Sequence, residues 1–123
     1  MPALRNDTLE GETMQMTVTN TEKAAIISAA GRMDAVTAPQ FDKRLETLVA
    51  EGATRIIIDF HDLEYISSAG LQTILANAKK LESLNGEILL VHLSGAVKEV
   101  FEISGFDTIF PIFDDLDAAL ASL

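Results

Sequence analysis

Residues 55–71 read RIIIDFHDLEYISSAGL, a continuous apolar run followed by a short polar stretch and a serine pair. The run Ile56-Ile57-Ile58 is β-branched and does not alternate with polar residues, which is typical of a central strand covered on both faces. After the Ser67-Ser68 pair, apolar residues recur at helical spacing at Leu71, Ile74, Leu75, Ala78 and Leu81. The stretch therefore predicts a buried strand, a turn and a helix that packs on the sheet.

Strands and helices alternate along the rest of the chain. The predicted elements are strands at 14–19 and 24–29, a helix from Thr37 to Gly52, a strand at 55–60, a helix after Ser68, a strand at 87–92, a helix from Ser94 to Gly105, a strand at 108–110 and a last helix capped by Asp114. Pro111 places the strand at 108–110 at a sheet edge. This order predicts one α/β domain over residues 14–123, with a mixed, mostly parallel sheet of about five strands and about four helices. Residues 1–13 are predicted to be an N-terminal tail or a short edge extension.

The helix after residue 36 carries strong start signals. Thr37 and Gln40 match a capping box, in which the threonine hydroxyl accepts a hydrogen bond from the first turn. Val36 and Phe41 have the spacing of a hydrophobic staple, and Pro39 falls in the first turn, where its missing N–H does little harm. The sequence therefore predicts Thr37 as the N-cap.

Composition excludes several classes of protein. The chain has 123 residues, 48% of them hydrophobic, a formal net charge of −10 and no cysteine. The missing cysteine excludes disulfides, thiolate metal sites and cysteine nucleophiles. The negative charge disfavours nucleic acid and anionic membranes, and it favours a partner with a basic face or serves solubility alone. No apolar run reaches the ~18 residues of a spanning helix and the N-terminus lacks a signal-peptide core, so we expect a cytoplasmic protein.

The serine pair lies where a strand ends and a helix begins. The first N–H groups of a helix carry partial positive charge, so a hydroxyl there caps the helix and a phosphate there is favoured. A serine pair at this place can also be a cap alone. Gly70 is a poor helix former, which suggests that something approaches the first turn closely. The pair is thus a candidate regulatory phosphorylation site.

Other chemistries find little support in the sequence. The histidines His61 and His92, with nearby Asp59, Asp62 and Glu64, match no metal-binding spacing. Ser68 lacks the glycine two residues before it that a hydrolase nucleophile elbow requires. The chain has no P-loop, and its basic residues are scattered. We therefore predict no metal, no cofactor, no direct nucleic-acid binding and no catalysis.

Three segments carry a family resemblance. Residues 59–71, DFHDLEYISSAGL, are similar to the signature of STAS domains of the anti-sigma factor antagonist family. Residues 31–38, GRMDAVTA, resemble the segment before the first helix of that family, and residues 94–106 fit its C-terminal region. The resemblance covers residues 14–123 and implies the same element order that the patterns predict.

The resemblance implies a non-enzymatic protein that binds an anti-sigma factor and thereby releases a sigma factor. In this family the anti-sigma factor is also a GHKL-type serine kinase, and a PP2C-type phosphatase reverses its action. By position Ser68 is the expected phosphoacceptor, and phosphorylation there would switch binding off. Ser67 stands where many members carry Asp. The expected partner-binding residues are Asp34, Thr37, Ser67, Gly70 and Leu71. The alternative is a STAS scaffold or ligand-sensing module that is not phosphorylated.

Overall fold

A buried aliphatic sheet organises residues 14–123, the part of the chain that the computed structural model describes. Its strands are β1 (Met14–Asn20), β2 (Ala25–Met33), β3 (Arg55–Asp59), β4 (Leu63–Ile66), β5 (Glu87–Val91) and β6 (Ile112–Phe113). The helices are α2 (Ala38–Ala50), α3 (Ser68–Glu82), α4 (Gly95–Ser104) and α5 (Leu116–Ala121), with a 3₁₀ turn η1 at Phe106–Thr108. Within residues 14–123, the predicted α/β class and the expected number of about four helices are confirmed, and the sheet has six strands.

The strand order is β1-β2-β3-β5-β6, and β4 pairs with the far end of β2. Only the β1–β2 pair among residues 14–123 is antiparallel, because the two strands are joined by a short turn. The other strands run parallel. Ile56, Ile57 and Ile58 lie between β2 and β5 and have no exposed surface. The predicted central strand is confirmed.

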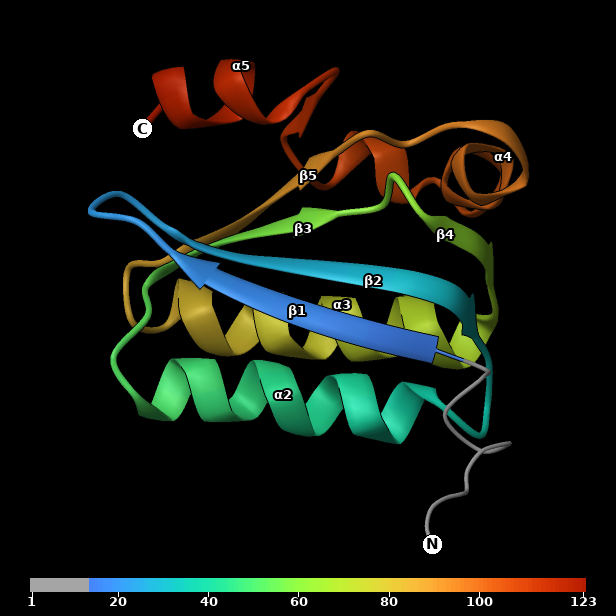
Figure 1. The fold of residues 1–123 in the computed structure, drawn as a ribbon, viewed down its shortest axis with the longest axis horizontal. Coiled ribbons are helices and arrows are strands. Elements are labelled where there is room, and N and C mark those ends of the chain that lie inside the picture. Colours follow the sequence, from blue (N-terminus) through green and yellow to red (C-terminus); the bar gives the residue numbers. More distant parts are fainter. Residues whose placement is uncertain (1–13) are drawn as a thin grey trace, which may run out of the picture.

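Helices cover both faces of the sheet (Figure 1). Helices α2 and α3 lie side by side on one face, where Phe41, Leu45 and Ile74 pack against Ile56 and Ile58 of β3. Helix α5 lies on the opposite face, and its residues pack against a second cluster that includes Ile57. The amino ends of α2 and α3 therefore meet at the end of the sheet where β2 and β4 finish.

Two predictions about elements are wrong, and strand β4 was not predicted. Residues 108–110 form no strand, because Thr108 ends the 3₁₀ turn η1 and the edge strand β6 begins only at Ile112. The last helix is capped by Asp115 and not by Asp114, since the Asp115 carboxylate accepts the N–H of Ala118 at 2.8 Å. The edge position predicted for the last strand holds for β6. The tail or edge extension predicted for residues 1–13 lies outside the described residues.

Candidate functional site

The serine pair starts α3, and its two hydroxyls have different surroundings. Ser67 is the N-cap: its Oγ accepts the N–H of Gly70 at 3.4 Å, and its own N–H donates to the Met33 carbonyl at 2.8 Å. Ser67 is half-buried, whereas Ser68 is exposed as the first residue of the helix. Since Ser67 serves the cap, Ser68 is the accessible hydroxyl at the positive end of the α3 dipole.

Gly70 and Leu71 lie behind this surface and belong to the core. A Cβ on Gly70 would come within 2.8 Å of the Ile66 side chain and 2.9 Å of the Met33 sulfur. The close approach expected at Gly70 thus comes from the chain's own β2 and β4. Leu71 has 5% of its surface exposed. Both residues therefore support the α3 start, and their predicted contact with a partner stays a prediction.

Asp34 organises the turn between β2 and α2. Its Oδ1 accepts the N–H of Val36 at 2.9 Å and that of Thr37 at 3.1 Å. The Thr37 hydroxyl accepts the N–H of Asp34 at 2.9 Å and donates to the Arg32 carbonyl at 2.8 Å. Side chains at both ends of the turn therefore hold its backbone in place.

The predicted capping box and staple are wrong, although Thr37 is the N-cap. The Thr37 hydroxyl points back to β2 and makes no cap bond. The Gln40 N–H, which a capping hydroxyl would bind, instead donates to the Thr37 carbonyl at 2.9 Å. Val36 is 75% exposed while Phe41 is completely buried, so the two do not form a staple. Thr37 is itself completely buried and fixes the turn, and its predicted contact with a partner stays a prediction.

The hydrogen bonds of the turn make Asp34 a source of pH-dependent stability. The main-chain N–H of Thr37, helped by Val36 and Arg32, lowers the pKa of Asp34 below its usual 3.8. A lowered folded-state pKa means that the stabilisation is complete above the unfolded value and is lost as the pH falls through the folded value. We expect the stability advantage of wild type over Asp34→Asn to be constant near neutrality and to shrink below pH 3.8. Thermal melts of both proteins from pH 7 to pH 2 measure this, and an advantage that stays constant would contradict it.

Four of the five residues weighed for a metal site form two separate pairs, and Glu64 belongs to neither. His92 Nδ1 lies 2.9 Å from Asp59 Oδ1, and His61 Nδ1 lies 2.9 Å from Asp62 Oδ1. The two imidazole rings meet edge to face with their centroids 5.5 Å apart. Within residues 14–123 no three of the usual metal-binding side chains come together as a possible site. The Asp59–His92 contact instead joins the carboxyl ends of β3 and β5.

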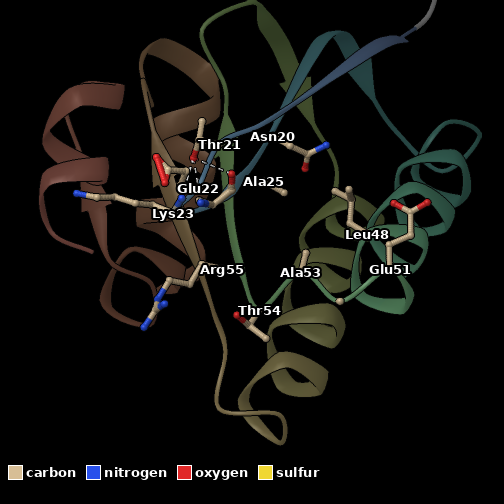
Figure 2. Close-up of a pocket in the computed structure, with 12 residues that line it drawn as sticks. Asn20, Thr21, Glu22, Lys23, Ala25, Leu48, Glu51, Ala53, Thr54 and Arg55 are labelled. Carbon is tan, nitrogen blue, oxygen red and sulfur yellow. Dashed lines mark hydrogen bonds between the residues drawn. The ribbon is translucent and has the colours of Figure 1, made fainter.

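A shallow hollow opens at the other end of the sheet (Figure 2). Its walls are the β1–β2 turn and the loop between α2 and β3. Thr21 shapes the turn, since its hydroxyl accepts the N–H groups of Lys23 and Ala24 and donates to the Ala24 carbonyl. The charged side chains around it are of both signs, among them Glu22, Lys23, Glu51 and Arg55. The hollow holds none of the predicted site residues.

Two features at the end of the sheet where α3 begins were not predicted from the sequence: the contact between Arg32 and Tyr65, and the exposed Val36. Arg32 and Tyr65 are register partners on β2 and β4, and the Arg32 guanidinium carbon lies 4.3 Å from the centre of the Tyr65 ring. Both side chains are exposed, as is Val36 on the neighbouring turn. The pairing could not be predicted because β4 itself was not recognised.

Known proteins are similar to this chain over most of its length. A sequence model of the STAS domain matches residues 15–119. The chain belongs to the STAS domain family. BtrV of Bordetella bronchiseptica, provisionally named an anti-sigma factor antagonist, is 38% identical over 109 residues, which cover 89% of this chain and 94% of BtrV. The STAS family and fold expected from the sequence are both confirmed.

Solved structures show the same fold. The crystal structure of an anti-sigma factor antagonist from Mycobacterium paratuberculosis matches with a TM-score of 0.83 and 26% identity, over 91% of this chain and 95% of that one. SpoIIAA of Bacillus in its phosphorylated form matches with a TM-score of 0.69 and 24% identity, over 88% and 97% of the two chains. In this STAS domain, no helix among residues 14–123 is long and apolar enough to cross a membrane.

Proposed function

We propose that this STAS domain is a cytoplasmic, non-enzymatic anti-sigma factor antagonist that phosphorylation of Ser68 switches off. Its partner would be an anti-sigma factor that is also a GHKL-type serine kinase, and binding would release the sigma factor. A PP2C-type phosphatase would remove the phosphate. The observation that carries the proposal is the exposed Ser68 at the start of α3, in a chain whose relatives are named anti-sigma factor antagonists.

The surroundings of the two serines favour Ser68 as the acceptor. A kinase must reach the hydroxyl, and Ser68 is exposed while Ser67 is half-buried and serves the cap. A phosphate on Ser68 would lie at the amino end of a helix of 15 residues, where the dipole and free N–H groups stabilise it. The helix therefore has no reason to unfold on modification.

Phosphorylation would act on the contact surface. It adds roughly 1.5 to 2 negative charges at pH 7 to a chain that already carries a net −10. A partner docked over Ser68 would have to bury this dianion or move away from it, and burying an unpaired charge is costly. Asp34 and Ser67 remain candidate contacts, since both are partly exposed at the same end of the sheet.

Binding and phosphorylation assays test the proposal together. Each GHKL-type anti-sigma factor of the source organism would be purified and titrated with wild type, Ser68→Asp and Ser68→Ala. We expect one of them to bind wild type, to bind Ser68→Asp at least tenfold more weakly, and to transfer phosphate from ATP to wild type but not to Ser68→Ala. A factor of ten corresponds to about 1.4 kcal/mol.

Ser94→Asp is the matched control. Ser94 is also an exposed serine before a helix, and its side chain makes no cap bond. We expect this variant to bind like wild type, because it adds the same charge at the start of a different helix, α4. Equal affinity of wild type and Ser68→Asp, without phosphate transfer, would reject the switch and favour the alternative, a STAS scaffold or ligand-sensing module that is not phosphorylated.

A further inference from the structure

Val36 is an exposed apolar side chain on the turn that follows β2, at the end of the sheet where α3 also begins (Figure 1). It is 75% exposed on the β2–α2 turn, and β2 is joined to the α3 start by the hydrogen bond from the Ser67 N–H to the Met33 carbonyl. Other large apolar side chains in residues 14–123 are exposed too: Ile103 near the end of α4 at 87%, and Ile109 and Leu84 at 54% and 53%. A single exposed valine is ordinary in itself, so its meaning depends on how it is held and on its neighbours.

The turn that carries Val36 is fixed by side chains on both sides. Its own N–H donates to Asp34 Oδ1, and the completely buried Thr37 ties the turn to β2 through the Arg32 carbonyl. Valine has few side-chain rotamers. Little backbone or side-chain entropy is therefore left to lose when a partner covers Val36, which lowers the cost of binding there.

Arg32 and Tyr65 add a second ordered element next to this turn. Their stacking, with 4.3 Å between the guanidinium carbon and the ring centre, restrains two long side chains before any partner arrives. Tyrosine and arginine, together with tryptophan, are enriched at the energetic centres of protein interfaces, whereas valine is not, so the stack strengthens the contact that Val36 begins. Arg32 also presents a positive charge on a chain whose net charge is −10.

We propose that Val36 is the apolar anchor by which the anti-sigma factor recognises this chain, with the Arg32–Tyr65 stack beside it facing a carboxylate of that partner. The inference rests on the proposed function and deepens it. The partner surface it predicts is an apolar pocket for Val36 with an acidic side chain at its rim. Val36 and the stack then determine which anti-sigma factor is bound, while Ser68 determines when.

Val36→Thr tests the anchor with little change of shape. Threonine keeps the β-branched form, and position 36 is exposed, so the fold should not be affected. In an apolar pocket the new hydroxyl would lose its water without gaining a partner. In titrations against the purified anti-sigma factor that binds wild type, we expect Val36→Thr to weaken binding about tenfold and Arg32→Gln to weaken it several-fold with a smaller dependence on salt.

Ile103→Thr is the matched control, since it makes a similar apolar-to-hydroxyl change at an even more exposed site on α4. We expect it to bind like wild type. If Val36→Thr also binds within twofold of wild type while Ser68→Asp binds weakly, the anchor is rejected and the proposed switch stands. If Val36→Thr binds weakly while Ser68→Asp binds normally, the anchor stands and the switch fails. If no GHKL-type anti-sigma factor of the source organism binds wild type, both are rejected.

Discussion

Gly86→Ala is expected to lower the free energy of unfolding by about 3 kcal/mol, because the added methyl group has no room. A Cβ at Gly86 would overlap the carbonyl oxygen of Thr54 and would come within 3.1 Å of the Leu81 side chain. That carbonyl already accepts the N–H of Glu87 at 2.9 Å, at the point where β5 begins to pair with β3. The obstacle is thus backbone held in the sheet, which cannot turn away as a flexible side chain could.

Urea unfolding of the variant measures this loss, and Gly95→Ala is the control. Gly95 has a φ of +55°, but a Cβ there would meet nothing within 4 Å. Alanine in this left-handed conformation costs about 1 kcal/mol through backbone strain alone. Gly86→Ala should therefore be clearly the less stable of the two. If Gly86→Ala lost less unfolding free energy than Gly95→Ala, β3 and β5 would have to separate easily at this point. That result would contradict the close approach of Gly86 to the Thr54 carbonyl.

The predictable parts of the fold are those set by residues close together in sequence. The run Ile56-Ile57-Ile58 predicts a strand buried on both faces, and Ser67 before an apolar helical stripe predicts a helix cap. Strand β4 was not predicted because its burial pattern is buried, exposed, exposed, buried, which lacks the alternation typical of a strand. It is a strand because β2 offers a parallel partner at residues 31–33, and that pairing is not visible in a single sequence.

The site illustrates the same limit. Thr37 has every local sign of a capping threonine, yet its hydroxyl bonds to the Arg32 carbonyl and to the N–H of Asp34. The capping box does not form, because hydrogen bonds from the Thr37 side chain to the turn compete with hydrogen bonds to the start of α2. The burial of the residues around the serine pair could not be predicted either: Ser68 is exposed, whereas Gly70 and Leu71 are buried. The prediction of Ser68 as phosphoacceptor rests on its position in the family signature, and its phosphorylation stays a prediction.

Asn77→Asp is expected to lower the free energy of unfolding at pH 7 by about 4 kcal/mol, since it buries a charge without a partner. Asn77 lies on α3, has no exposed surface, and donates from its Nδ2 to Asp42 Oδ1 of α2 at 2.8 Å and to the Thr73 carbonyl at 2.9 Å. Its Oδ1 is buried without a hydrogen-bond partner in residues 14–123. A carboxylate would turn both donated bonds into contacts between acceptors, and one of them into repulsion between two carboxylates.

The pH dependence of this loss separates charge from shape. Burial and the neighbouring Asp42 should raise the pKa of the introduced carboxyl above its unfolded value of about 3.9. A raised folded-state pKa means that the penalty is present at neutral pH and is relieved as the pH falls through the folded value, where the protonated group donates again. Denaturant unfolding at pH 7 and pH 5 should therefore show a smaller loss in acid.

Asn85→Asp makes the same chemical change at an exposed position and should stay within about 0.5 kcal/mol of wild type. A loss for Asn77→Asp that is equally small at pH 7 would mean that α2 and α3 separate enough to admit water around position 77. That outcome would bear on the site, because α2 and α3 begin at the turn that holds Val36 and at Ser68. If the hydrogen bond from Asn77 to Asp42 fixes α2 against α3, Asn77→Asp should also bind the anti-sigma factor more weakly. This effect would be indirect, because Asn77 has no exposed surface for a partner to contact.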